Sequence, residues 1–275
     1  MMTSFWRKSG HAVAAGALLA FLRLAQVRGG FDPATGLALP SVPGTVLTVC
    51  LLFCLIAEPL LQRRASRAHV RLADALRPVG PAALPTLICA ALLFLAGGLA
   101  LAAAGALQGG RYALIQGIAG VLGAASGGGL LLLVRALRRE ERAPVSVTGL
   151  LPALFFTVFL TLTVYLPSAA DPVLARYWLR VLATALMAFA FSQLAGLVQG
   201  EATPRGFLIT ANWAVVSCAA VLGDAASLPL KALYLAGALT LAVFAALIRD
   251  DLPEKGPEEA EEDKKTGQAP KEFDA

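Results

Sequence analysis

The chain has 275 residues, of which 57% are hydrophobic and only 15% are charged, and its mean hydropathy is +0.71. A soluble domain carries about 25% charged residues, so this composition excludes an ordinary water-soluble protein. The net charge is +5, but residues 249–275 hold ten acidic and five basic side chains, so the preceding 248 residues carry +10. A basic body of this kind fits contact with anionic lipid head groups, and we expect no nucleic-acid partner.

Apolar runs of membrane-spanning length dominate the sequence. The hydrocarbon core of a bilayer is about 30 Å thick and requires about 20 apolar residues per helical span. The runs are rich in Leu, Ala, Val and Phe without alternating polarity, which favours helices. They lie near residues 10–27, 41–61, 82–107, 113–135, 147–166, 178–199, 207–224 and 229–248. We therefore predict an all-α integral membrane helical bundle of about eight transmembrane helices over residues 1–248.

The first run, residues 10–27, has two interpretations. Arg7 and Lys8, followed by an apolar stretch, resemble a signal peptide. Arg23 and Arg28, however, stand where a cleavage site requires small residues. We expect a retained helix, with a cleaved leader as the alternative.

Basic residues alternate in density between the predicted loops. Arg63, Arg64, Arg67, Arg71 and Arg77 follow the second span, and Arg138, Arg139 and Arg142 follow the fourth. Lys and Arg are retained on the cytoplasmic side. The distribution predicts a multi-pass protein of the plasma (inner) membrane with both termini in the cytoplasm.

The residues after the last span differ in composition from the rest of the chain. Residues 249–275 are charged, poor in apolar side chains, and interrupted by Pro and Gly. Such a segment buries too little surface to fold alone. We expect a disordered, charged cytoplasmic tail.

Arginines between the second and third spans recur every three or four residues. Arg63, Arg67 and Arg71 have this spacing, while alanine, leucine and valine fill the other side. We favour the interpretation that these charges only fix the topology. The alternative is an amphipathic helix on the inner leaflet, with Arg63, Arg64, Arg67 and Arg71 as candidate contacts to anionic lipid head groups.

Residues that intramembrane enzymes require are not combined in this sequence. Ser126 has no histidine at its depth, because His11 and His69 both fall at the inner surface. Glu58 and Asp224 fall at opposite faces and cannot form a carboxylate pair. The four cysteines lie in apolar runs, where a thiol behaves as a small hydrophobe, although metal or redox chemistry is an alternative. We expect no enzyme activity, cofactor or metal.

The outer half of the bundle carries more basic than acidic residues. An excess of bases on the side expected to be base-poor suggests an outward-facing anion or solute site. The interpretation that we favour is a ring of snorkelling and capping residues scattered round the bundle. The candidate site residues are Arg23, Asp32, Arg111, Arg180, Asp224 and Lys231.

Other polar and small residues within the spans have predicted partners. We expect Glu58 to snorkel to water and pair with Arg63 and Arg64, with a proton relay as the alternative. We expect Gln193 to bond Asn212 across a hairpin, with a substrate contact as the alternative. Glycines of the fourth span favour close helix packing. A helix break at residues 127–129, of the kind transporters use, is the alternative.

The segment Phe31-Asp32-Pro33-Ala34-Thr35-Gly36-Leu37 resembles a pattern of uncharacterised multi-spanning bacterial membrane proteins. That resemblance implies no activity and no functional residues. Two functions remain: a non-enzymatic membrane component, such as a scaffold, accessory subunit or assembly factor with a membrane-protein partner, or a transporter for a small, anionic solute.

Overall fold

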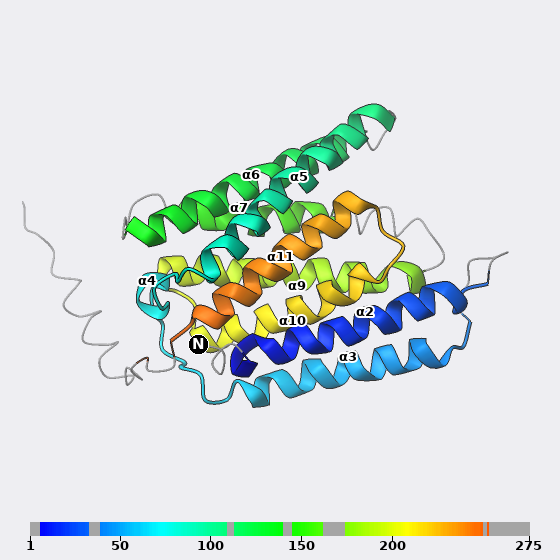
Figure 1. Ribbon diagram of the computed structural model, residues 1–275, viewed down its shortest axis with the longest axis horizontal. Helices are drawn as coiled ribbons and strands as arrows, with labels where there is room; N and C mark the ends of the chain where they lie inside the picture. Colours follow the sequence, from blue (N-terminus) through cyan, green and yellow to red (C-terminus); the bar gives the residue numbers. More distant parts are fainter. Residues whose placement is uncertain are drawn as a thin grey trace, which may run out of the picture.

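The protein is a bundle of helices that run side by side along the long axis of the molecule (Figure 1). The computed structural model describes residues 6–32, 39–108, 113–139, 145–161, 174–249 and 252. Helices α2 and α3 lie on one side of the bundle, α5 and α6 lie on the other, and α9, α10 and α11 lie between them. The helices are η1 (Trp6–Gly10, a π-helix), α2 (His11–Gly29), α3 (Val42–Leu61), α4 (Leu72–Ala75), α5 (Ala83–Gln108), α6 (Ala113–Arg139), α7 (Val145–Phe159), α9 (Leu174–Gln199), α10 (Pro204–Leu222) and α11 (Leu228–Leu247).

Seven of the described helices are long and apolar enough to cross a bilayer. The predicted all-α membrane bundle is confirmed, and the number of spans differs in one place. The span predicted at 147–166 corresponds to α7, whose 15 residues cover about 22 Å at 1.5 Å per residue. That is less than the bilayer core, and residues 162–173 lie outside the described part. The first predicted span corresponds to α2, which packs against α3 and α10.

Local sequence sets where two of these helices begin. The Ser41 hydroxyl accepts a hydrogen bond from the Gly44 N–H at 3.3 Å, and a proline follows the cap. The Thr203 hydroxyl accepts from the Gly206 N–H at 3.1 Å, again with a proline next. Both caps satisfy a backbone donor that has no partner within the helix.

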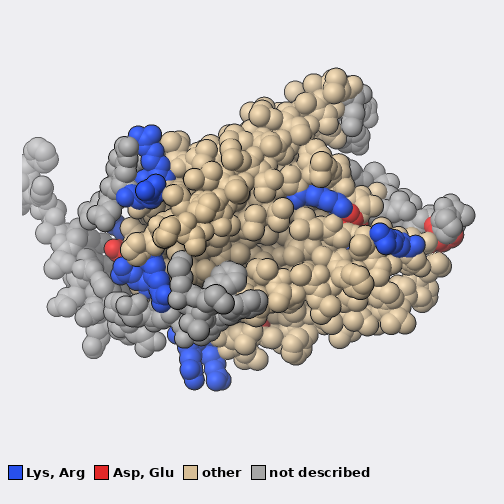
Figure 2. Space-filling view, viewed as in Figure 1, with Lys and Arg blue, Asp and Glu red and all other residues tan. Residues whose placement is uncertain are grey.

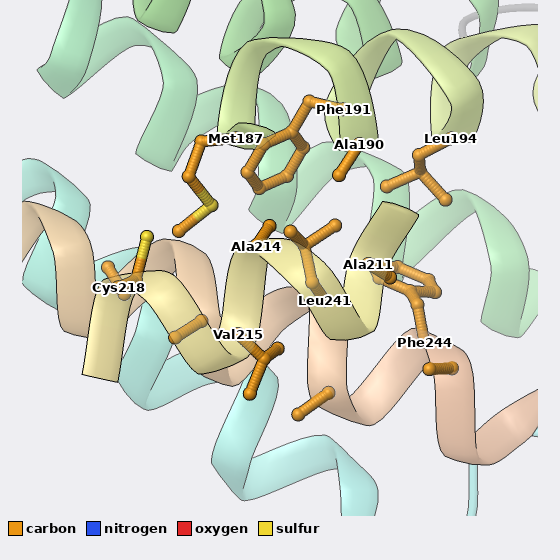
Figure 3. Packing of buried hydrophobic residues seen from close by; sticks show 14 of the residues in the cluster. Met187, Ala190, Phe191, Leu194, Ala211, Ala214, Val215, Cys218, Leu241 and Phe244 are labelled. Atoms are coloured by element: carbon orange, nitrogen blue, oxygen red, sulfur yellow. The ribbon is translucent and has the colours of Figure 1, made fainter. Parts of the chain in front are cut away.

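Helix α10 lies at the centre and packs against α2, α3, α9 and α11. Figure 3 shows Met187 and Phe191 of α9, Ala214 of α10 and Leu241 of α11 converging on one packed region. All four side chains are buried. Lipid tails are as apolar as these side chains, so close packing stabilises the bundle more than removal from water does.

Aromatic rings join α5, α7 and α9. Phe156 stacks on Phe191 with ring centroids 5.5 Å apart and planes inclined by 11°. Phe94 meets Phe155 edge-on at 6.3 Å. These four rings are fully buried. Arrangements of this kind add about 0.5–1.5 kcal/mol per pair beyond area burial, so the rings fix how the three helices pack.

Glycines let the backbones of α5 and α6 touch. A Cβ at Gly120 would lie 2.6 Å from the Gly98 carbonyl oxygen, and one at Gly98 would lie equally close to the Gly120 carbonyl oxygen. The predicted close packing of the fourth span is therefore confirmed. The alternative of a break at residues 127–129 is wrong, because α6 is continuous from Ala113 to Arg139.

The amphipathic helix considered as an alternative after the second span is not formed. Only Leu72–Ala75 is helical between α3 and α5. Leu72, Ala75 and Leu76 are buried in the protein core rather than in the lipid surface. Leu76 also pairs with Ile248 in an isolated antiparallel bridge. Tertiary contacts thus override the helical periodicity. The periodicity alone cannot show whether the apolar face is covered by lipid or by the rest of the protein.

The described residues do not test the predicted tail. Of residues 249–275, only Arg249 and Leu252 are described. The prediction of a disordered charged segment therefore falls outside the described part of the chain.

Candidate functional site

Two arginines share one aspartate where α2, α9 and α10 meet. Asp224 follows α10, and its Oδ1 accepts from Arg23 Nη2 at 3.2 Å while its Oδ2 accepts from Arg180 Nε at 2.7 Å. Arg180 Nη2 also donates to the Ala225 carbonyl oxygen at 2.9 Å. Arg23 Nη1 donates to Gln26 Oε1 at 2.8 Å. We call Arg23, Gln26, Arg180 and Asp224 the Asp224 cluster.

Close packing of α2 on α10 brings Arg23 to Asp224. A Cβ at Gly16 of α2 would lie 2.6 Å from the Ala219 side chain, so the two helices approach closely there. At the end of α10, a Cβ at Gly223 would overlap the backbone of Ala20. Small residues on both helices therefore place Arg23 of α2 beside Asp224, which follows α10.

Two of the three charges of this cluster are buried, and the third is mostly buried. Arg23 is 0% exposed, and the side chains of Asp224 and Arg180 are 2% and 16% exposed. An isolated buried charge is very costly, whereas a paired one is tolerated. Aromatic rings add support, since the Arg23 guanidinium lies 5.7 Å from the Phe31 ring centroid, and the Arg180 guanidinium lies 5.7 Å from that of Tyr177.

Three of the six residues proposed as an anion or solute site come together. Arg23, Arg180 and Asp224 form the cluster, and Arg23 points into the bundle beside the other two. Asp32 lies half-buried just after α2. Lys231 lies in the first turn of α11, and its ammonium group makes no hydrogen bond or ion pair with any described residue. Arg111 lies outside the described residues.

A second polar cluster lies at the end of the bundle that holds α4. Glu58 Oε1 accepts from Gln62 Nε2 at 2.8 Å and from Asn212 Nδ2, and Glu58 Oε2 lies 2.8 Å from His11 Nε2. Asn212 Nδ2 also donates to the Lys8 carbonyl oxygen at 2.6 Å. The Lys8 ammonium group donates to the Ile248 carbonyl oxygen. We call Lys8, His11, Glu58, Gln62 and Asn212 the Glu58 cluster.

The Glu58 cluster corrects two predictions. Glu58 is 4% exposed and bonds side chains of its own bundle rather than snorkelling to Arg63 and Arg64. Asn212 bonds Glu58 and the backbone of Lys8, not Gln193. The pairing with Gln193 assumed that α10 faces only the helix preceding it in sequence, whereas α10 also packs on α2 and α3.

Sequence reasoning named Lys8, His11, Glu58 and Asn212, but it missed Gln62 and the convergence of these residues. Each is a polar side chain inside or beside an apolar run, which is the available signal. The four-residue spacing of Glu58 and Gln62 also indicates one helix face. The contribution of Lys8 and His11 depends on the position of the chain before α2, which no local pattern specifies.

No protein-family model, curated protein or solved structure matches this chain. The resemblance drawn from residues 31–37 stays a prediction. Residues 33–38 lie outside the described part.

Neither cluster has the composition of a metal centre. Within the described ranges, no three His, Cys, Asp or Glu side chains gather as a metal site requires. The four cysteines are free: Cys218 is buried, Cys50 and Cys54 are half-buried, and Cys89 is exposed. Ser126 donates to the Leu122 carbonyl oxygen of its own helix at 2.8 Å.

The arginines proposed as lipid head-group contacts lie at the α4 end. Arg63, Arg64, Arg67 and Arg71 are all exposed, in the segment that joins α3 to α4. Figure 2 shows Lys and Arg side chains gathered at that end, with fewer at the opposite end. The four arginines do not share a helix face, because residues 62–71 contain no helix.

Proposed function

We propose that the protein is a non-enzymatic component of a membrane assembly, acting as a scaffold, accessory subunit or assembly factor. The observation that carries this proposal is the closure of the Asp224 cluster. Arg23 is 0% exposed, and its carboxylate partner, Asp224, is nearly so. The charges that would have recognised a solute are therefore used to hold α2, α9 and α10 together.

A transporter is the alternative, and the same residues favour it less. A solute site requires charged groups that border water at some stage of transport. Only Arg180 has partial access, with 16% of its side chain exposed, and both its Nε and its Nη2 already have acceptors. The cluster has the composition of a structural ion-pair group that joins helices.

Vesicle flux measurements test the proposal. Full-length protein reconstituted in vesicles should pass chloride, nitrate and phosphate no faster than protein-free vesicles do. Mild solubilisation of the native membrane should yield a complex of greater mass than the purified 28.5 kDa chain in the same detergent. Flux that Arg180→Gln abolishes would establish a transporter, and migration as an isolated chain would contradict an accessory role.

We further propose that both termini face the cytoplasm of the plasma membrane. The support is the gathering of basic side chains at the α4 end, which is the expected cytoplasmic pattern. In a variant with all four cysteines replaced by alanine, Phe273→Cys should react with an impermeant maleimide only after the cells are permeabilised.

A matched position supplies the control. Ser227 is exposed at the opposite end of the bundle, before α11, so Ser227→Cys should react in intact cells. The reverse pattern of labelling would place the termini outside.

A further inference from the structure

A cavity of about 740 Å³ opens at the α4 end of the bundle. It lies between the segment around α4, the ends of α6 and α9, and Arg249, two residues after the end of α11. Four arginines and one aspartate are among its lining residues: Arg71, Asp74, Arg77, Arg138 and Arg249. Among the described residues that line the cavity, four positive charges accompany one negative charge, and this excess favours anions.

The backbone around the cavity is held by long-range hydrogen bonds. The Arg77 N–H donates to the Leu247 carbonyl oxygen at 2.8 Å, and the Arg249 N–H donates to the Ala75 carbonyl oxygen at 2.8 Å. Two arginines that are distant in sequence are thereby fastened side by side. Ala75 is fully buried, so the backbone that carries these arginines is anchored to the core of the protein. Preorganisation of this kind lowers the conformational cost of binding.

The lining of the cavity is amphipathic. Leu137 of α6 and Val198 of α9 contribute half-buried apolar surface beside the arginines. Both residues lie near the ends of membrane-spanning helices. That is the depth at which a lipid head group and the first carbons of its chains are located. A phospholipid matches the combination of charge and apolar surface better than a small hydrophilic anion does.

We propose that this cavity binds the phosphate group of an anionic phospholipid. The guanidinium groups of arginine form paired hydrogen bonds with phosphate oxygens, and their charge is retained at every physiological pH. The arginines at this end therefore have different roles. The arginines that line the cavity bind one lipid head group. Arg63 and Arg64 lie outside the cavity and attract the anionic membrane surface without selecting one lipid. The site does not depend on whether the protein is an accessory subunit or a transporter.

Binding of dioctanoyl phosphatidic acid to the full-length protein in neutral detergent tests this site. Arg138→Gln with Arg249→Gln should weaken binding at least tenfold, because two of the four charges are removed from the cavity. Both side chains are exposed, so the fold should tolerate the change. Arg63→Gln with Arg64→Gln removes the same charge at the same end and should change binding less than twofold.

Further probes separate the sources of phosphate and the competing occupants. Dioctanoyl phosphatidylcholine should bind at least tenfold more weakly, and millimolar inorganic phosphate should not displace phosphatidic acid. An equal loss of affinity for phosphatidic acid in the two double variants would overturn the proposal. Binding would then depend on the total positive charge of this end and not on the cavity. Tighter binding of inorganic phosphate than of lipid would assign the cavity to a soluble anion and overturn the lipid.

The acidic residues of 250–275 are the remaining competitor. Their net charge is opposite to that of the cavity, and they follow Arg249 directly in sequence. If lipid binds only after Glu258, Glu259, Glu261 and Glu262 are replaced by glutamine, the proposal is overturned and the tail is the occupant. Equal binding by that variant and the parent chain supports the lipid.

Discussion

Replacing Asp224 with alanine should destabilise the bundle by about 3–5 kcal/mol, since the change leaves a buried guanidinium without its carboxylate. Arg23 has no exposure through which it can reach water, and Arg180 loses the same acceptor. The measurement is the loss of monodisperse protein with temperature in one detergent. A marked downward shift of the apparent melting temperature is expected.

Two further variants make this result specific to the ion pair. Asp74→Ala removes an exposed aspartate at the opposite end and should change stability by less than about 0.5 kcal/mol. Combining Arg23→Met with Asp224→Asn removes the buried charge pair and should recover most of the loss. If Asp224→Ala were as stable as Asp74→Ala, the Asp224 cluster would have no structural role, and the main support for the proposed function would be lost.

Properties encoded locally were predictable. Runs such as residues 229–248 determine helix type and position by length and hydropathy, and the structure places α11 at Leu228–Leu247. Arg23 is another case, because a base inside an apolar run requires a partner wherever the helix packs. The sequence therefore indicated Arg23 as a residue that needs compensation, and Asp224 was among the candidate site residues.

Properties that depend on which helix faces which were less predictable. Asn212 was expected to pair with a residue of the preceding helix, yet its partners come from α3 and from the chain before α2. The depth of a residue in the membrane can be counted from the ends of its helix. The rotation of a helix about its axis, and which helices are its neighbours, cannot be obtained in that way. The same limit explains why Lys231 was grouped with Arg23 and Arg180, although its ammonium group bonds no described residue.

The segment between α3 and α5 shows a third kind of limit. Its arginine spacing matches an amphipathic helix, but Leu76 pairs with Ile248 and Arg77 with Leu247 through backbone hydrogen bonds. A period of 3.6 residues identifies an apolar face without identifying what covers it. Here the covering surface is the protein itself, and the basic cavity exists because of that difference.

Glycine packing between α5 and α6 supplies the second large effect. Gly120→Ala should separate the two helices, because the added Cβ would lie 2.6 Å from the Gly98 carbonyl oxygen and 2.7 Å from the Ala102 Cα. Both obstacles are backbone atoms, which cannot rotate away as a side chain can. Overpacking of this kind costs about 1–3 kcal/mol, which exceeds the gain of up to about 1 kcal/mol in helix propensity.

The same helix offers a matched control at Gly128. A Cβ at Gly128 meets nothing within 4 Å, so Gly128→Ala gains helix propensity without a clash. In a common detergent, the apparent melting temperature should fall for Gly120→Ala and stay level or rise for Gly128→Ala, and Gly120→Leu should fall further. All three changes are in α6. A general effect of substituting its glycines would therefore shift the three apparent melting temperatures in the same direction. Equal melting temperatures for the two alanine variants would mean that α5 and α6 are not held by direct backbone contact, and the close approach at Gly98 and Gly120 would then contribute nothing to the stability of the bundle.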